Sequence, residues 1–331
     1  MKLKPLSEQT LVITGATSGI GLVTARRAAA RGARLVLVAR NGEALERLSR
    51  SLAAQGCDNA HVAADVADEE ALARAAAVAV DRFGGFDTWV NDAGVMLYGK
   101  SEQVARADQR RLFETNFWGV VNGSTIAVRH LRQRGGALIN VGSEVSDHAA
   151  PLIGAYVASK HAVKGFTDTL RIELKHDRAP VSVTLIKPGS IDTPICAHAK
   201  NVMDRKPSLP PPVYAPDLVA AAILHAAEHP TRDLYVGAFA RVVSSATQFA
   251  PRLADRFIAN FSFPGMVRDE PPPRSGEDNL ERPRSDLRER GGVSPHPLGA
   301  SLYTQAAMRT SAVPLAALAL FSVAAAAWRA R

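Results

Sequence analysis

Residues 1–240 alternate short runs of leucine and β-branched residues with alanine-rich stretches of helical periodicity, and this alternation limits the fold more than any other feature. It is typical of βαβ units, in which parallel strands form one sheet and helices cover both of its faces. We predict a single-domain α/β fold with a doubly wound, seven-stranded parallel sheet. The expected strands are 10–14, 34–39, 61–64, 87–91, 137–142, 181–186 and 234–236, and the expected helices are 19–31, 43–55, 69–83, 108–134, 155–176, 216–228 and 241–260.

The composition changes twice within the second half of the chain. Residues 190–216 include a stretch rich in proline and lysine, which predicts a long loop, and such loops often close over ligands, so we expect a substrate lid. From residue 264 the chain becomes rich in proline, arginine and acidic residues, a composition that buries too little apolar surface to fold alone. We therefore predict a domain over 1–263 and a linker over 264–310.

An apolar segment follows the predicted linker. The 17 residues from 312 to 328 carry no charge and lie between Arg309 and Arg329. A membrane span needs about 20 residues, with a lower limit of ~17, so the length alone does not decide the role of this segment. For residues 311–329 we keep two interpretations open, a membrane anchor and a helix that docks on the domain or on a second subunit.

The net charge of +8 raises the question of a nucleic-acid partner. The basic residues are spread along the chain without a block of five or six, so the sequence argues against nucleic-acid binding. Cys57 and Cys196 are too few for a disulfide framework or a cysteine-rich metal site, and we predict no metal. These cysteines and the polar first ten residues, which lack a signal-peptide core, predict a cytoplasmic location.

A glycine-rich turn, Thr14-Gly15-Ala16-Thr17-Ser18-Gly19-Ile20-Gly21, joins the first predicted strand to the first predicted helix. In such a turn the first glycine permits a tight reversal, the second lets the backbone approach a pyrophosphate, and the third lets helix and strand pack closely. A P-loop is excluded, because Leu22 and Val23 follow Gly21 where a P-loop has Lys and Ser or Thr. The turn predicts a dinucleotide site in a Rossmann-type fold, with an ordinary strand-to-helix turn as the alternative.

The end of the second predicted strand bears on the choice of cofactor. Ala39 and Arg40 stand where NAD-binding folds place an acidic residue on the adenosine ribose. Ala39 removes a charge that would repel a 2′-phosphate, and Arg40 offers planar donors suited to one. We expect NADP(H) rather than NAD(H), the alternative being that Arg40 is only a solvated residue. Asp65, after the third predicted strand, is expected to accept a hydrogen bond from adenine.

A catalytic group is predicted around Tyr156. Tyr156 and Lys160 are four residues apart in a predicted helix, so their side chains lie on one face about one turn apart. A tyrosine with a pKa of about 10 is a poor acid or base at neutral pH unless a cation stabilises its phenolate, and Lys160 supplies one. Ser143 follows the strand 137–142, at the sheet edge where ligands bind. Asn116 upstream completes the group.

These residues, in this order, resemble the short-chain dehydrogenase/reductases, in their single-domain, NADP(H)-preferring branch, over about residues 6–245. Asn91-Asp92-Ala93-Gly94 is similar to the Asn-Asn-Ala-Gly segment of the family, and Pro188 to Thr193 is similar to the stretch that closes over nicotinamide. Two residues depart from the pattern: Asp92 replaces the second Asn, and Gly142 stands where a second Ser is frequent. Neither departure removes a reacting group.

The resemblance implies an oxidoreductase that acts on the CH–OH group of donors and passes hydride between a nicotinamide and a carbonyl compound or secondary alcohol. Ser143 and Tyr156 would bind the substrate oxygen, and Tyr156 would act as general acid or base. Lys160 would lower the pKa of Tyr156 and bind the nicotinamide ribose, and Asn116 would hold a water of a proton relay. The expected cofactor-binding residues are Gly15, Thr17, Ser18, Gly19, Ile20, Gly21, Arg40, Asp65, Val66, Asn91, Ala93, Gly94, Tyr156, Lys160, Pro188, Gly189, Ile191 and Thr193.

Several other expectations complete the hypothesis. The alternative function is a catalytically silent NADP(H)-binding regulatory protein on the same fold, whereas an epimerase or dehydratase would need a larger substrate domain. His148 and His161 are expected to be structural, and Glu144 either lines the pocket mouth or faces water. The lid residues Ile195, Val202, Met203 and Leu209 suggest an apolar substrate. The family resemblance implies a homo-dimer or tetramer, and deletion of 265–331 should leave a folded enzyme that is released from any membrane the tail binds.

Overall fold

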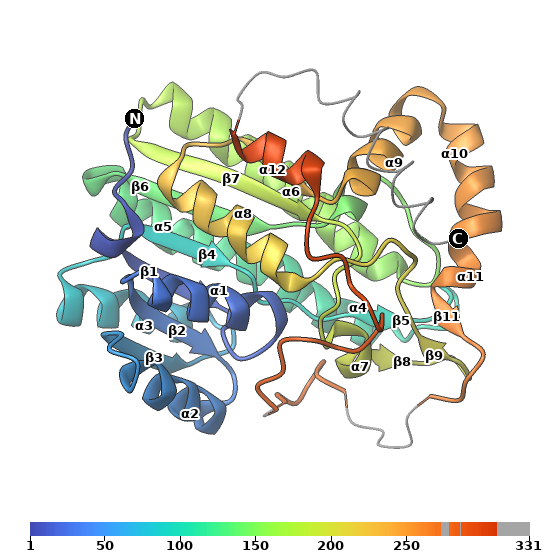
Figure 1. Cartoon of the computed structure of the whole chain (residues 1–331), viewed down its shortest axis with the longest axis horizontal. Helices are drawn as coiled ribbons and strands as arrows, with labels where there is room; N and C mark the ends of the chain where they lie inside the picture. The colour runs from blue at the N-terminus through green and yellow to red at the C-terminus, as the bar shows by residue number, and fades with distance from the viewer. Residues whose placement is uncertain (273–277, 285, 310–331) are drawn as a thin grey trace.

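The predicted strands form one parallel sheet in the computed structural model, which describes residues 1–272, 278–284 and 286–309 (Figure 1). Within this part of the chain seven strands pair in the order β10-β7-β6-β4-β1-β2-β3. The order reverses between β1 and β4, and ligands of such sheets bind at the carboxyl ends of the strands beside this reversal. The strands are β1 (Thr10–Thr14), β2 (Arg34–Ala39), β3 (Asn59–Ala63), β4 (Thr88–Asn91), β6 (Gly136–Val141), β7 (Val181–Pro188) and β10 (Asp233–Val236).

Helices cover both faces of the sheet, as the alternation of strands and helices predicts (Figure 1). One face carries α1 (Gly19–Ala30), α8 (Pro216–Glu228) and α12 (Leu302–Arg309), and the other carries α3 (Glu69–Phe83), α5 (Gly119–Arg134) and α6 (Gly154–His176). Helix α2 (Gly42–Ala53) packs beside β2 and β3. The Rossmann-like α/β architecture predicted from the sequence is therefore confirmed.

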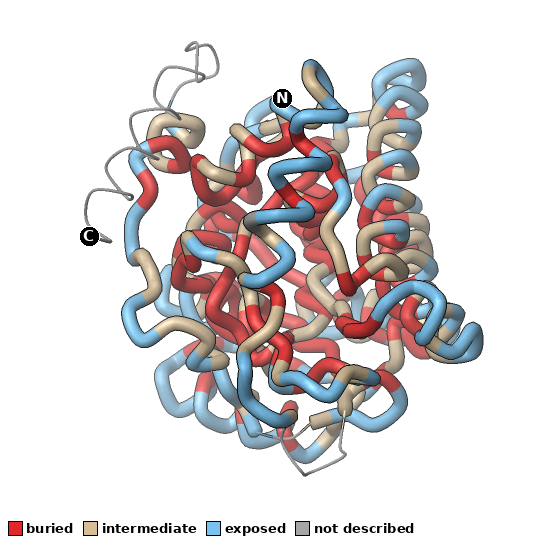
Figure 2. Tube along the Cα trace, turned by 90° about the vertical axis from the view of Figure 1, so that its right-hand side faces the viewer, coloured by how far each residue is buried: buried red, intermediate tan, exposed pale blue. Residues whose placement is uncertain are grey.

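Strand β1 illustrates why the strands read as continuous apolar runs. Leu11 and Ile13 pack with α1 and α8 in one core, whereas Val12 packs with α3 and α5 in the other. Successive side chains of a strand point to opposite faces, so a strand covered on both sides needs apolar residues at every position. Figure 2 shows that the buried residues gather at the centre of the molecule.

Two predicted helices are interrupted. The stretch predicted as one helix over 108–134 consists of α4 (Arg106–Phe113), a π-helical turn η2 (Glu114–Trp118) and α5. The stretch predicted over 241–260 consists of α9 (Ala238–Phe249), α10 (Pro251–Phe257) and a second π-helical turn η4 (Ile258–Ser262). Pro251 has no backbone N–H and opens the second of these helices, which explains the break there.

The segment predicted as a linker over 264–310 packs against the domain wherever the structure describes it. It contains α11 (Phe263–Gly265), β11 (Val267–Arg268) and α12, and β11 pairs antiparallel with β9 (Lys206–Pro207). A few apolar residues among its prolines, Met266, Leu280 and Tyr303, are each at most 2% exposed. Composition alone missed these anchors because they are far apart in the sequence.

Parts of the predicted lid over 190–216 also form regular secondary structure. It contains the short helix α7 (Ile195–His198) and the strand β8 (Lys200–Asn201), which pairs with β5 (Leu97–Tyr98), besides β9. A short 3-10 helix, η1 (Leu6–Glu8), precedes β1, and another, η3 (Glu144–Ser146), follows β6. The apolar segment 311–329 lies outside the described residues. Among the residues that are described, no helix combines the length and the apolar character needed to span a membrane.

Candidate active site

One cavity runs along the carboxyl ends of β1, β4, β6 and β7, where the order of the strands reverses. Three residues assigned to the site from the sequence, Gly21, Asn91 and Asn116, do not line this cavity. Those that do are Gly15, Thr17, Ser18, Gly19, Ile20, Arg40, Asp65, Val66, Ala93, Gly94, Ser143, Tyr156, Lys160, Pro188, Gly189, Ile191 and Thr193. The fold thus brings together segments spread over almost 180 residues of sequence.

The glycines of the first turn are required by the geometry. Gly15 and Gly19 have φ values of 72° and 51°, in the left-handed region that disfavours other residues. A Cβ on Gly21 would lie 2.4 Å from the carbonyl oxygen of Gly15 and 2.8 Å from Oδ2 of Asp92. Gly21 therefore acts by letting α1 approach the turn rather than by facing the cavity.

The side chains of Thr14 and Asn91 form hydrogen bonds that hold the ends of the strands beside the cavity. The backbone N–H groups of Asp92 and Ala93 donate to Oγ1 of Thr14, at 3.1 and 3.2 Å, which ties the glycine turn to the end of β4. Asn91 is 3% exposed, and its Nδ2 donates to Oδ1 of Asn140 at 2.8 Å. Its side chain thus belongs to a buried polar network and not to the cofactor surface expected for it.

Asn116 is fully buried within the π-helical turn η2. Its Oδ1 accepts from the N–H of Val95 at 2.8 Å, and its Nδ2 donates to the Val95 carbonyl at 3.0 Å and to Oγ of Ser159 at 3.3 Å. The amide thus joins the chain after β4 to helix α6. Both of its N–H groups are used in this way, so a relay water bound by this side chain would have to donate to Oδ1.

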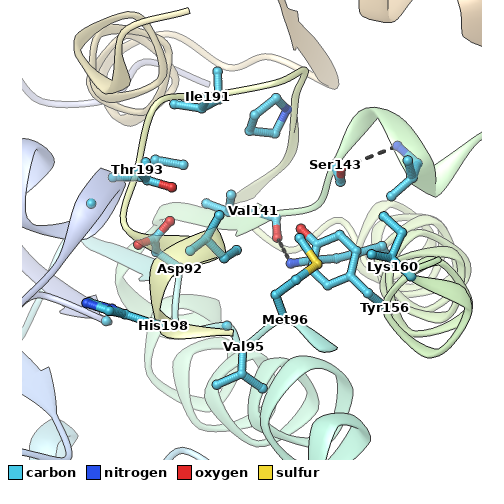
Figure 3. A pocket seen from close by; sticks show the side chains of 18 of the residues that line it. Asp92, Val95, Met96, Val141, Ser143, Tyr156, Lys160, Ile191, Thr193 and His198 are labelled. Atoms are coloured by element: carbon cyan, nitrogen blue, oxygen red, sulfur yellow. Dashed lines mark hydrogen bonds between the residues drawn. The ribbon is translucent and has the colours of Figure 1, made fainter. Parts of the chain in front are cut away.

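Tyr156, Lys160 and Ser143 meet at the inner end of the cavity (Figure 3). Tyr156 and Lys160 project from α6 and are 8% and 4% exposed, and Ser143 follows β6. Nζ of Lys160 donates to the carbonyl of Val141 at 2.8 Å and lies 5.6 Å from the centre of the Tyr156 ring. The one-face spacing predicted for Tyr156 and Lys160 therefore places both beside the strand end that carries Ser143.

Burial governs the protonation of these groups. It raises the pKa of Tyr156 above its ordinary value, the charges of Asp92 and Glu144 raise it further, and a hydrogen bond with the Ser143 side chain opposes the shift. Burial lowers the pKa of Lys160 to about 8 against the opposing effect of Asp92. We expected Lys160 to lower the pKa of Tyr156, but its ammonium group donates to Val141 and desolvation dominates. Tyr156 is therefore a neutral phenol at neutral pH.

The stretch from Pro188 to Thr193 forms another wall of the cavity, and Figure 3 shows its Ile191 and Thr193 on the side away from Tyr156. The N–H of Gly189 donates to the Val236 carbonyl at 2.9 Å, and the N–H of Asp192 donates to the Tyr214 carbonyl at 2.8 Å. A Cβ on Gly19 would lie 3.1 Å from Cβ of Thr193, so the two walls approach each other closely.

Comparisons with known proteins agree with this geometry. Residues 9–203 match the family model described as short chain dehydrogenase. The chain is 43% identical over 329 residues to the uncharacterized oxidoreductase YxnA of Bacillus subtilis, which covers 98% of this chain and 92% of YxnA. The chain is a short-chain dehydrogenase/reductase. The family resemblance and the oxidoreductase class predicted from the sequence are therefore confirmed.

Three further proteins match this chain at lower identity. The putative oxidoreductase SadH of Mycobacterium tuberculosis is 31% identical over 260 residues, covering 75% of this chain and 93% of SadH. An alcohol dehydrogenase from Thermococcus sibiricus, solved with 5-hydroxy-NADP, is 27% identical with a TM-score of 0.61, covering 69% of this chain and 95% of that one. A Burkholderia phymatum member solved with NAD, 23% identical with a TM-score of 0.68 over 76% of this chain and 96% of that one, supports the fold.

The C-terminal segment of this short-chain dehydrogenase/reductase lies across the cavity. We call its described residues 278–284 and 286–293 the strap. The guanidinium of Arg40 donates to the carbonyls of Asn279, Leu280 and Glu281, at 3.1 Å for Leu280 and 3.4 Å for Glu281. The N–H of Gly19 donates to the Arg288 carbonyl at 2.9 Å. Arg40 and Gly19, which the sequence predicts to bind the cofactor, thus donate hydrogen bonds to backbone carbonyls of the strap.

Asp65 is engaged as well. Its carboxylate accepts from the Ala67 N–H at 3.0 Å and forms an ion pair with Arg111. Nε of Arg111 lies 3.5 Å from a carboxylate oxygen of Glu281, in the strap. Asp65 therefore lies at the cavity, as predicted, within a charged group that includes the strap.

The remaining part of the cavity is largely apolar. Its walls include Met96, Val145, Ile153, Leu209, Phe239, Val243, Ile258 and Met266. Of the lid residues expected to face the substrate, Ile195 and Leu209 line the cavity, whereas Val202 and Met203 do not. Sequence reasoning missed Phe239, Val243 and Met266, because no local motif marks residues that helices α9 to α11 carry to the site.

Proposed function

We propose that the protein is an NADP(H)-dependent oxidoreductase that interconverts an apolar carbonyl compound and the corresponding secondary alcohol, with Tyr156 as the general acid or base. The observation that supports this most directly is that Ser143, Tyr156 and Lys160 line the same cavity as a glycine-rich turn. No metal-binding cluster of His, Cys, Asp or Glu occurs among the described residues.

The cavity fits a dinucleotide in its chemistry. Glycines stand where the backbone bends back on itself, and the helix α1 begins there, so its N-terminal N–H groups and dipole favour an anion. The glycine turn would hold the pyrophosphate, and Lys160 and the stretch Pro188–Thr193 would hold the nicotinamide half. When bound, the nicotinamide would supply or accept the hydride.

The side chains around the reacting carbon have separate tasks. The hydroxyl of Ser143 and the phenol of Tyr156 would bind the substrate oxygen. Because burial keeps the phenol neutral, Tyr156 can donate its proton to the oxygen as a carbonyl is reduced. Lys160, with a pKa of about 8, carries a positive charge at neutral pH that can hold a ribose hydroxyl. Asn116 would keep Val95 and Ser159 in place behind these groups.

The preference for NADP(H) rests on Ala39 and Arg40. Arg40 lines the cavity at the end of β2, and its planar donors suit a phosphate. The strap carbonyls that it binds would have to yield this position to a 2′-phosphate.

Replacement of Tyr156 tests the proposed chemistry. Tyr156→Phe should lower the turnover of NADPH with a panel of apolar ketones by about 10²–10⁴-fold, because general acid catalysis contributes that much. The dissociation constant for NADPH should change by less than about twofold, which calorimetry would measure. Tyr303→Phe, which removes a buried phenol outside the cavity, is the matched control. Full turnover by Tyr156→Phe would overturn the role of Tyr156 as general acid or base, whereas no turnover of any ketone by the wild type would favour a silent binding protein.

The cofactor preference has a test of its own. Arg40→Leu should lower kcat/KM for NADPH by about tenfold, the equivalent of one charge-assisted hydrogen bond, and should leave kcat/KM for NADH unchanged or higher. Arg50→Leu, which removes an exposed arginine of α2, should change neither value. Equal losses with both cofactors would contradict a role of Arg40 in phosphate selection.

A further inference from the structure

Two polar side chains, Glu144 and His148, lie in the otherwise apolar part of the cavity. Both belong to the turn that follows Ser143, and both line the cavity. Their side chains are 15% and 7% exposed. Buried polar groups usually have hydrogen-bond partners, so a buried ring nitrogen without one in a ligand cavity requires an explanation.

His148 presents a free acceptor. Its Nδ1 lies 2.9 Å from the carbonyl oxygen of Ala149, and since a carbonyl can only accept, Nδ1 carries the hydrogen. Burial lowers the pKa of His148, so the ring is neutral at pH 7 and Nε2 keeps its lone pair. Nε2 is buried and has no hydrogen-bond partner among the described residues.

Glu144 faces the same space. One of its carboxylate oxygens lies 4.0 Å from Nε2 of His148, which is too far for a direct hydrogen bond. Burial alone raises the pKa of Glu144 to about 7, so near neutral pH the carboxyl group can either accept or donate. A hydroxyl oxygen that came to about 2.8 Å from both atoms would bridge them, because it can donate to His148 while it hydrogen bonds with Glu144.

The turn that carries this pair is held firmly. Asp147, between the two residues, is 2% exposed and pairs with Nζ of Lys187 on β7 at 2.9 Å. The hydroxyl of Tyr235 on β10 donates to the same carboxylate at 2.7 Å. Ser143 begins the turn, and its Oγ accepts from the N–H of Val145 at 3.3 Å. The group that binds the reacting oxygen and the Glu144–His148 pair therefore keep a fixed spacing.

We propose that Glu144 and His148 form a subsite for a second, hydroxyl-bearing position of the substrate. The preferred substrates are then apolar hydroxyketones, and diols in the reverse direction, whose hydroxyl group lies at one particular distance from the reacting carbonyl. A carboxylate is disfavoured beside Glu144, and an apolar group would leave Nε2 of His148 without a partner. This inference rests on the proposed function and specifies its substrate class.

The experiment compares an apolar ketone of about ten carbons with derivatives that carry one hydroxyl group at successive positions. The wild type should favour one derivative over the parent ketone by about tenfold in kcat/KM. His148→Phe and Glu144→Leu should each bring this ratio close to one, and kcat/KM of His148→Phe for the parent ketone should change by less than about threefold. His161→Phe, on the exposed face of α6, is the matched control and should keep the ratio.

Three results would overturn the subsite. They are a ratio near one for every derivative with the wild type, an unchanged ratio in both variants, and a stronger preference for an amino group than for a hydroxyl at the same position. Glu144→Gln, which retains the side-chain shape and a hydrogen-bonding head, should keep part of the preference and so separates loss of the subsite from loss of the fold. In all three results the parent ketone is still reduced, which distinguishes them from failure of the proposed oxidoreductase.

Discussion

Asp92 is the residue whose role changes most between sequence and structure. It replaces an asparagine of the family pattern, and it lines the cavity between the glycine turn and Lys160. Burial raises the pKa of Asp92 to about 7, against the opposing effects of Lys160 and of the Gly21 N–H. An ionised Asp92 in turn raises the pKa of Lys160. The substitution thus adds a carboxyl group that titrates near neutral pH beside the reacting groups.

Asp92→Asn should make the stability of the protein less dependent on pH. The folded-state pKa of Asp92 is about 7 and its ordinary value is 3.8, so between these values the folded state binds more protons than the unfolded state. Wild-type stability should therefore fall as the pH rises through this window, by about 1–3 kcal/mol. The variant lacks this loss, so Tm of the variant minus Tm of the wild type should be larger at pH 8 than at pH 5.

Thermal denaturation across the pH range measures this difference, and Asp81→Asn, an exposed change on α3, is the control. A Tm difference for Asp92→Asn that stays constant from pH 5 to pH 8 would show that Asp92 titrates normally in the folded protein.

The strap occupies hydrogen-bond donors in the cavity that a cofactor phosphate would use. Its carbonyl groups accept from Arg40 and Gly19, and its other contacts with the domain include an ion pair between Arg26 and Glu289 and a hydrogen bond between His198 and Asp286. A phosphate can bind at these donors only after the strap carbonyls have moved. If the form of the protein that can bind the cofactor is only partly populated, the apparent affinity for the cofactor falls in proportion.

Asp286→Ala combined with Glu289→Ala should therefore tighten cofactor binding. The exposed ion pair contributes about 0.2–1 kcal/mol and the hydrogen bond about 0.5–1.5 kcal/mol, so loss of both should lower the apparent dissociation constant for NADPH by about threefold to seventyfold. Calorimetric titration measures this change. Asp269→Ala, an exposed acidic residue outside the strap, should have no effect. Weaker binding in the double variant would mean instead that the strap holds the cofactor in place.

The difference between what could and could not be predicted follows from the range of the interactions. The sheet, the glycine turn and the pair Tyr156 and Lys160 could be predicted, because strand alternation, turn chemistry and helical spacing are local. The contact between Gly19 and Arg288 joins residues about 270 positions apart, and no periodicity marks it. The buried state of Glu144 also depends on helix α9, which packs on the turn that carries it.

Residues 264–272, 278–284 and 286–309 belong to the folded domain. Met266 and Leu280 pack in the core that contains Tyr156, and Tyr303 packs with Tyr235 at the edge strand β10. The N–H of Gly237 donates to Oγ1 of Thr304 at 3.0 Å. The similarity to YxnA spans 98% of the chain and so includes this segment. The cavity is therefore completed by residues beyond the 9–203 region that defines the family.

These contacts argue against the expectation that deletion of residues 265–331 leaves a folded enzyme. A chain of residues 1–263 loses the buried side chains of Met266, Leu280 and Tyr303, each worth about 1.5–3 kcal/mol, and the sum of about 5 kcal/mol or more is comparable with the stability of a whole domain. We expect this chain to unfold at a much lower denaturant concentration than the full protein, and a chain of residues 1–309 to match the full protein.

Urea denaturation of the three chains distinguishes these cases, and Leu280→Ala in the full protein should cost about 2–5 kcal/mol by itself, because it leaves a cavity in the core. Membrane fractionation of the 1–309 chain against the full protein then tests the anchor interpretation of residues 311–329 in a folded background. If the 1–263 chain unfolds at the same urea concentration as the full protein, the packed C-terminal segment contributes nothing to the stability of the domain, and the competition between strap and cofactor becomes its main effect.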